Sequence, residues 1–165
     1  MDNDNVVDLD SRRRGTNIVT FPVLSIKNAT IEKILNAGRQ KLCFTGMSTF
    51  VTGEHFPAGN LGLVREYLTF DRSVVISQLI NVELPQMGVR PATAAEMLYD
   101  YVVNHDVLWH IRLAIALGQT WRNPKDGRHY AATIQKNDKS RMVVAYSLRP
   151  DEMFGTLWHF PVVEL

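Results

Sequence analysis

Cysteine is nearly absent from this 165-residue sequence, in which Cys43 stands alone. A single thiol excludes an intramolecular disulfide and a metal site built from several cysteines. No apolar run approaches the roughly 18 residues of a membrane-spanning helix, and the polar, acidic N-terminus lacks the apolar segment of a secretory signal. We therefore expect a cytoplasmic protein with no membrane partner, no metal and no cofactor.

Recognisable catalytic motifs are also missing. The stretch TGMSTF lacks the second glycine of a nucleophile elbow, and GEHFPAGNLG fits neither the P-loop nor the dinucleotide fingerprint. Nothing in the local sequence supports a nucleophilic dyad of Cys43 with His55. The spacing of His105, Asp106 and His110 matches no zinc motif. We assign no catalytic residue, and the sequence favours a protein that is not an enzyme.

Charge is balanced in total but unevenly distributed. Eighteen basic and 17 acidic residues give a net charge of +1. Residues 1–16 contain four aspartates followed at once by three arginines, and we interpret them as an extended charged tail before a single domain, residues 17–165. Between residues 105 and 149, eight basic residues stand against three acidic ones, so this region has a local excess of positive charge.

The N-terminal half predicts a smaller, irregular α/β arrangement. Residues 17–27 are β-rich, but Pro22 makes them an edge or irregular strand. Asn28 is the predicted N-cap of a helix that continues to Ala37 and stops at Gly38. The remaining predictions are one or two short strands and a loop over 43–62, a helix over 61–70, and either a strand or a helix over 73–84.

A capping box marks the best-defined helix. Thr93 is followed three residues later by Glu96, the spacing at which the two side chains satisfy each other's backbone N–H groups. The apolar stripe that follows consists of Met97, Leu98, Tyr101 and Val102. This pattern predicts a helix over about 93–104 with one buried face.

The second half predicts strands. Residues 110–121 alternate strictly, with Ile111, Leu113, Ile115 and Leu117 on one face, which is typical of a strand with one buried side. Three further strand-like runs cover 129–135, 141–149 and 157–165, and short turns separate the four. Pro161 favours an edge position for the last run.

Short connections favour an antiparallel meander. The predicted fold class is therefore α+β, a C-terminal four-stranded antiparallel meander packed against the helix over 93–104, with the irregular N-terminal half completing the core. The helix is expected to cover the apolar face, which contains Trp121, Tyr130 and Tyr146 together with Ile115.

The other face collects polar side chains, namely His110, Arg112, Thr120, His129, Thr133, Gln135, Arg141, Ser147, Arg149 and His159. In a meander, His129, Arg149 and His159 meet at one end of the sheet. Strands about 4.8 Å apart place the two histidines about 10 Å from each other with the arginine between them. This arrangement suits an anion such as phosphate or carboxylate. Its alternative is a solvated polar face, which antiparallel sheets commonly have.

Three functions remain open. The leading one is a non-enzymatic, protein-binding accessory protein of bacterial or phage type, alone or as a homo-oligomer. Its predicted partner-binding segment is the tail, through Val6, Val7, Leu9, Arg12, Arg13 and Arg14. The second is nucleic-acid binding through the basic region 105–149 and Arg12–Arg14, with Trp109, Trp121 and Tyr130 as stacking groups. The third is an enzyme or binder for a small anion at His129, Arg149 and His159.

Overall fold

The computed structural model describes residues 25–165. The predicted tail over residues 1–16, with its partner-binding segment, lies outside the described residues, as does most of the strand predicted over 17–27. Within residues 25–165, every helix is too short or too polar to cross a lipid bilayer.

Three long strands form the centre of the first sheet: β5 (Leu113–Arg122), β6 (His129–Lys136) and β7 (Arg141–Leu148). They pair antiparallel in sequence order, because the turns between them are short. The fourth strand is β1 (Gly46–Met47), which runs parallel to β7. The fold is α+β as predicted, but the sheet is mixed and is not a four-stranded antiparallel meander.

The last strand, β9 (Phe160–Glu164), does not pair with β7. The chain crosses over after β8 (Met153–Phe154), and His159 forms a parallel bridge with Ala114 at the beginning of β5. Strand β9 then lies between β2 (Glu66–Leu68) and β4 (Val89–Pro91) in a second, antiparallel sheet.

The edge position predicted from Pro161 is wrong, since β9 is the central strand of the second sheet. The Pro161 carbonyl accepts a hydrogen bond from the N–H of Ala92, just beyond the end of β4. Because the N and C=O of one residue face the same side of a strand, the missing N–H of Pro161 also faces this region. The central proline therefore costs no hydrogen bond between β9 and the residues of β4.

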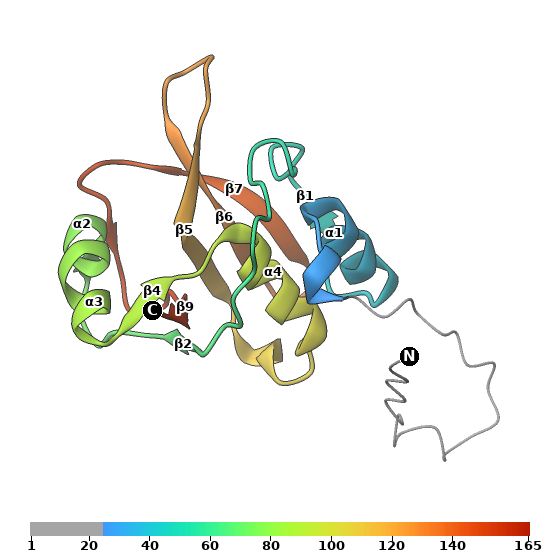
Figure 1. Ribbon diagram of the computed structural model, residues 1–165, viewed down its shortest axis with the longest axis horizontal. Coiled ribbons are helices and arrows are strands. Elements are labelled where there is room, and N and C mark those ends of the chain that lie inside the picture. The colour runs from blue at the N-terminus through green and yellow to red at the C-terminus, as the bar shows by residue number, and fades with distance from the viewer. Residues whose placement is uncertain (1–24) are drawn as a thin grey trace.

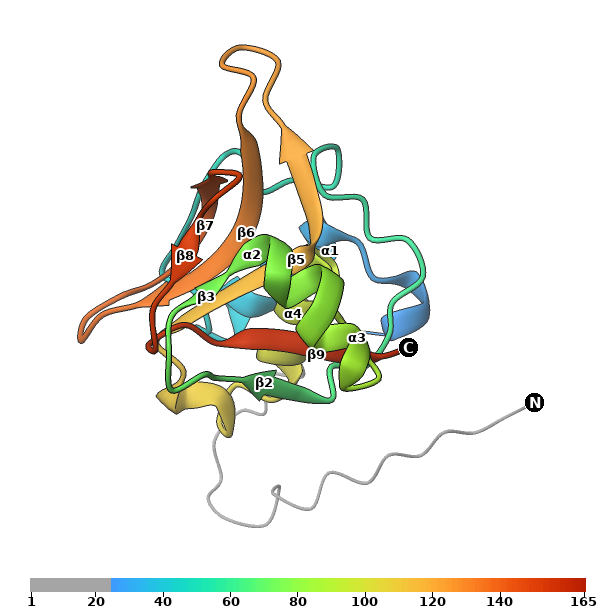
Figure 2. The same ribbon diagram turned by 90° about the vertical axis from the view of Figure 1, so that its left-hand side faces the viewer.

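Both faces of the β5–β7 strands are covered (Figures 1 and 2). Helices α1 (Ile31–Gln40) and α4 (Ala94–Val103) share one hydrophobic core with Ala114 and Ala116 of β5. Small side chains on this face let the helices approach the sheet closely.

The opposite face of β5 carries Ile115 and Leu117, which belong to a second core. The helical segment that covers this face consists of α2 (Ile76–Gln78), a π-helical turn (Leu79–Glu83) and α3 (Leu84–Gln86). Strand β3 (Val74–Val75) leads into it and pairs with β8. The prediction that α4 covers the Ile115 face is therefore wrong, because α4 covers the alanine face.

The register of β6 differs from the prediction by one residue. Thr133 pairs with Ile115 and Val144, is fully buried, and donates its hydroxyl to the carbonyl of Val144, so it is not on an exposed polar face. A bulge between Ala116 and Trp121 then turns Trp121 onto the α4 side of the sheet, where it pairs with Tyr130. Alternation alone predicted that Trp121, Tyr130 and Tyr146 share one face. In the structure, Trp121 and Tyr130 lie on the face opposite to Tyr146.

The helix predicted over 28–37 is shifted. Its N-cap is Thr30, whose hydroxyl accepts the N–H of Lys33, while Asn28 ends the short 3-10 helix η1 (Ile26–Asn28). The helix also continues past Gly38 to Gln40. Gly38 lies so close to the ring of Phe44 that a Cβ atom there would clash with it.

Residues 61–70 do not form the predicted helix. They run as an extended segment whose centre is β2, paired with β9. Residues 73–84, for which the sequence left strand and helix open, form β3 followed by the helical segment over 76–86.

The capping box of α4 is confirmed. The Thr93 hydroxyl accepts the N–H of Glu96 at 3.3 Å, and the Glu96 carboxylate accepts the N–H of Thr93 at 2.8 Å. The predicted stripe of Met97, Leu98, Tyr101 and Val102 is fully buried.

Replacing Thr93 with alanine should destabilise the protein by about 0.5–2 kcal/mol, because the N–H of Glu96 loses its acceptor. The midpoint of urea denaturation measures the change. Thr93→Ser, which keeps the hydroxyl, is the matched control and should remain close to the wild type. Equal midpoints for all three proteins would contradict the assignment of Thr93 as the N-cap of α4.

Candidate functional site

The crossover of β9 separates the three residues of the predicted anion site. His129 and Arg149 line one surface hollow of about 710 Å³ between the β5–β6 turn and the end of β7. His159 lines a different pocket on the other side of β5. The structure therefore brings together two of the three residues.

The hollow around His129 and Arg149 also contains an acid. The Glu152 carboxylate accepts hydrogen bonds from the Tyr146 hydroxyl at 3.1 Å and from the backbone N–H of Arg149 at 3.3 Å. His129 is turned toward Thr120, with 3.4 Å between Nδ1 and Oγ1. The negative charge of Glu152 weakens this hollow as a site for an anion.

A second group of basic side chains surrounds Trp109. The Trp109 side chain lies on η3 (Leu108–His110) and the residue is 57% exposed. Lys136 Nζ lies 3.9 Å from the centre of its ring, and the guanidinium carbon of Arg141 lies 3.8 Å from it. Lys136 Nζ also donates to the Trp109 carbonyl at 2.6 Å. We call Trp109, Lys136, Lys139 and Arg141 the Trp109 patch.

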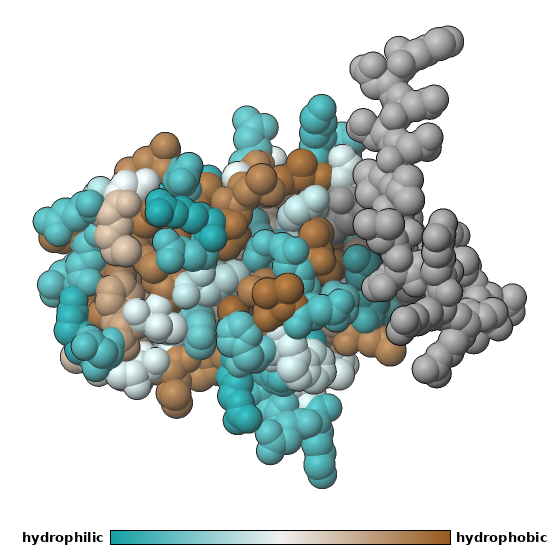
Figure 3. All heavy atoms as spheres, turned by 90° about the horizontal axis from the view of Figure 1, so that it is seen from below, coloured by the Kyte–Doolittle hydropathy of each residue, from teal (hydrophilic) through white to brown (hydrophobic). Residues whose placement is uncertain are grey.

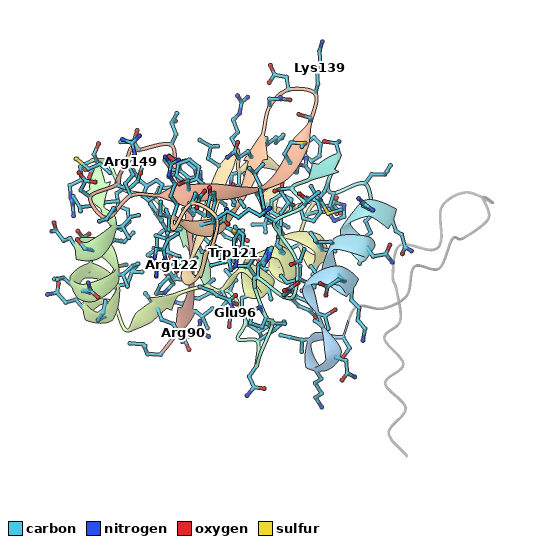
Figure 4. The ribbon with its side chains drawn as sticks, turned by 90° about the horizontal axis from the view of Figure 1, so that it is seen from above. Arg90, Glu96, Trp121, Arg122, Lys139 and Arg149 are labelled. Atoms are coloured by element: carbon cyan, nitrogen blue, oxygen red, sulfur yellow. The ribbon has the colours of Figure 1, made fainter. Side chains whose placement is uncertain are left out.

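The turn between β6 and β7 positions these cations. Lys136 and Arg141 are direct partners across the two strands. Asn137 Oδ1 holds the turn by accepting the N–H groups of Lys139 and Ser140 and the hydroxyl of Ser140. Lys139 lies at the outer end of this turn, far from Arg149 (Figure 4). Two like charges therefore face each other next to an exposed indole.

Arg141 is buried without an acidic partner. It is 4% exposed and donates to the Cys43 carbonyl at 3.1 Å, while its Nε has no hydrogen-bond partner in the part of the chain that the structure describes. Within residues 25–165 no carboxylate forms an ion pair with it; the nearest compensation comes from the rings of Trp109 and Tyr101. A buried cation that lacks an anion is unusual and leaves positive charge beneath the surface of the patch.

The positive charge of Arg141 affects the pKa of Lys136. Desolvation and then the positive charges of Arg141 and Arg112 lower the pKa of Lys136. The acid of the turn, Asp138, lies 3.7 Å from Arg112, and both side chains are exposed. The patch therefore keeps an excess of positive charge that an incoming anion would relieve.

The other two aromatic residues proposed for stacking are already in contact with neighbouring rings. Trp121 stacks on His55 with 3.8 Å between ring centroids, and it also contacts Phe50 and Tyr130. Tyr130 donates its hydroxyl to Asp126 within the β5–β6 turn. Of the three aromatic residues that the sequence singled out, Trp109 is the one whose surface is more than half exposed.

The remaining sequence candidates do not form reactive groups. Burial raises the pKa of the Cys43 thiol. The His55 ring stacks on Trp121, and its Nδ1 lies 2.8 Å from the Phe50 carbonyl. His105 contacts Asp106 at 3.0 Å, whereas His110 contacts the Val107 carbonyl. The part of the chain that the structure describes contains no cluster of three or more His, Cys, Asp or Glu side chains suited to a metal ion.

Sequence reasoning identified Trp109 and the basic region but missed the pairing of Lys136 with Arg141. The signal was available, since the two residues flank the four-residue turn NDKS and are therefore cross-strand neighbours. Like charges in such a position are destabilising unless something compensates them.

Comparison of the chain with known protein families, with characterised proteins and with solved structures finds no match.

Proposed function

We propose that this protein binds single-stranded nucleic acid at the Trp109 patch. The observation that carries this proposal is an indole, more than half exposed, with two cations within 4 Å of its ring centre. No carboxylate of residues 25–165 is paired with the buried cation. Proteins that bind single strands combine aromatic rings, on which unpaired bases stack, with basic side chains that follow the phosphates.

The arrangement fits a flexible strand better than a duplex. Bases inside a duplex are stacked on each other, so a side chain such as Trp109 reaches them only in an unpaired strand. Lys139 lies in the β6–β7 turn, and Arg112, just before β5, lies 3.7 Å from Asp138 of that turn, so both offer exposed positive charges for neighbouring phosphates. The neutralisation of such charges makes binding salt-dependent.

A protein partner remains the alternative. The tail residues that support it lie outside the described residues, so this function stays a prediction. On the face that Figure 3 shows, hydrophobic and hydrophilic residues are mixed, and this surface does not indicate a large apolar interface.

Fluorescence anisotropy with short labelled DNA and RNA strands tests the proposal. Trp109→Ala should weaken binding roughly 5- to 100-fold, the usual range for the loss of one stacking ring. Lys139→Gln should weaken binding less and should reduce the slope of log K against log salt by about 0.7, because one phosphate contact is lost.

Lys125→Gln is the matched control, because Lys125 lies in the β5–β6 turn at the other end of β6. This variant should leave the affinity and the salt slope almost unchanged. Equal effects of the two lysine variants, or the absence of salt-dependent binding by the wild type, would overturn the proposal.

A further inference from the structure

A second pocket lies on the other side of η3. It has a volume of about 550 Å³, within the range of about 300–1,000 Å³ that is typical of small-molecule sites. Its walls come from β2, the C-terminal part of α4, η3 and the residue before β9. We call it the His159 pocket; its polar side chains include Tyr67, Asp100, His110 and His159.

Both histidines of the pocket are oriented by the backbone. His159 Nδ1 lies 3.2 Å from the Leu113 carbonyl, and His110 Nδ1 lies 3.0 Å from the Val107 carbonyl. A carbonyl oxygen only accepts hydrogen bonds, so each Nδ1 carries a proton. In the neutral form of each ring, Nε2 is then left as a hydrogen-bond acceptor.

Tyr67 and Asp100 add a donor and an acceptor. The Tyr67 hydroxyl is buried beside Asp100, and burial, followed by the charge of Asp100 and a hydrogen bond to its carboxylate, raises the pKa of Tyr67. Burial also raises the pKa of Asp100, whose carboxylate accepts from Asn104 Nδ2 at 2.8 Å. Tyr67 and Asp100 therefore form a polar pair in the wall of the pocket, and the carboxylate keeps acceptor positions for a ligand or water.

A single helical turn, η3, lies between the pocket and the Trp109 patch. Leu108 and His110 line the pocket, whereas Trp109, the residue between them, belongs to the patch. A strand bound at Trp109 would therefore need to pass around one helical turn to reach the pocket.

We infer that the His159 pocket takes one unpaired base of the bound strand and prefers adenine or cytosine to thymine or uracil. This inference rests on the proposed nucleic-acid function. The amine of adenine or cytosine donates to the carboxylate of Asp100 or to a histidine Nε2, and the Tyr67 hydroxyl, which donates to Asp100, positions that carboxylate. Thymine and uracil present a carbonyl oxygen where these bases present the amine, so an acceptor of the pocket remains unpaired.

The charge of the pocket favours a base over a phosphate. Arg65 lies 3.5 Å from Glu66 and 3.7 Å from Glu164, so its positive charge is already shared between two carboxylates. Asp100 then leaves the lining with an excess of negative charge. Val64, Leu108 and Ile111 supply apolar surface for the flat faces of the base.

Anisotropy with labelled oligo(dA), oligo(dC) and oligo(dT) of equal length tests the inference. The wild type should bind oligo(dA) and oligo(dC) roughly 10-fold more tightly than oligo(dT), which is the effect of about one hydrogen bond to a charged group. Tyr67→Phe and Asp100→Asn should each bring this ratio close to one. Tyr146→Phe, which removes a hydroxyl bonded to Glu152 on the other side of the sheet, is the matched control and should keep the ratio.

The outcomes separate the two proposals. Equal affinity of the wild type for the three strands, together with weaker binding of all three by Trp109→Ala, would overturn the base pocket and leave the proposed function standing. No binding of any strand would overturn both. Thermal unfolding of each variant verifies that it is folded, and if one of the two pocket variants fails to fold, the ratio measured for the other decides.

Discussion

Replacing Arg90 with alanine should destabilise the protein by about 3–5 kcal/mol at neutral pH, because the variant leaves a buried carboxylate without its cation. The Glu96 side chain is fully buried, and Arg90 pairs with it through two hydrogen bonds of 2.9 and 2.7 Å. The same carboxylate accepts the N–H groups of Thr93 and Gly62 at 2.8 and 2.6 Å. One side chain thus joins β4, the start of α4 and the chain before β2 (Figure 4).

The stability of this variant should depend less on pH than that of the wild type. In the wild type, burial raises the pKa of Glu96, but the hydrogen bonds from Arg90, Thr93 and Gly62 outweigh burial, so the pKa is lowered overall. A lowered folded-state pKa stabilises the protein above about pH 4.3, the ordinary value for glutamate, and this contribution is lost as the pH falls. Without Arg90, fewer interactions oppose the effect of burial on the pKa of Glu96, so Arg90→Ala should lose less stability than the wild type as the pH falls and Glu96 becomes protonated.

Urea denaturation at several pH values measures both effects. Arg90→Lys is the conservative control, and because lysine cannot form the paired bonds it should recover only part of the stability. The double variant Arg90→Ala, Glu96→Gln removes the buried charge and should be more stable at neutral pH than Arg90→Ala alone. Parallel pH profiles for Arg90→Ala and the wild type would contradict the role of this ion pair.

Local patterns in the sequence predicted the parts of the fold that local interactions determine. The capping box places α4 correctly because Thr93 and Glu96 interact within one helical turn. The antiparallel order of β5–β7 follows from the short turns that connect them. These features need no information from distant residues.

Long-range pairing explains where prediction failed. Leu61, Val64 and Leu68 have helical spacing, yet this segment pairs with β9, which lies more than 90 residues further along the chain. Likewise, Ala114 and Ala116 fit an exposed face as well as one covered by a helix, because alanine has little polarity and little apolar area. Only the position of α4 decides whether this face is exposed or covered.

The candidate site was predictable in composition but not in geometry. The basic excess over 105–149 and the exposed Trp109 belong to the same region of the sequence, as proposed. The burial of Arg141 depends on Cys43 and Tyr101, which come from other elements. The separation of His159 from His129 depends on the crossover to β5. No periodic pattern contains that information.

Replacing Ile115 with alanine should lower the free energy of unfolding by about 2–5 kcal/mol, through lost apolar contact and the cavity left behind. Ile115 is fully buried in the second core with Leu117 and Phe160. Ile115→Leu, which conserves volume, should cost less than about 1.5 kcal/mol. Urea denaturation measures both changes.

The adjacent residue tests the opposite face of the same strand. Ala116 is fully buried in the core that contains α4, so Ala116→Val should overpack this face and cost about 1–3 kcal/mol. A strand with one solvated face would instead tolerate or favour this β-branched residue. Destabilisation by both Ile115→Ala and Ala116→Val requires a strand that is covered on both sides, whereas a neutral Ala116→Val would return β5 to the one-sided strand that its alternating sequence predicted.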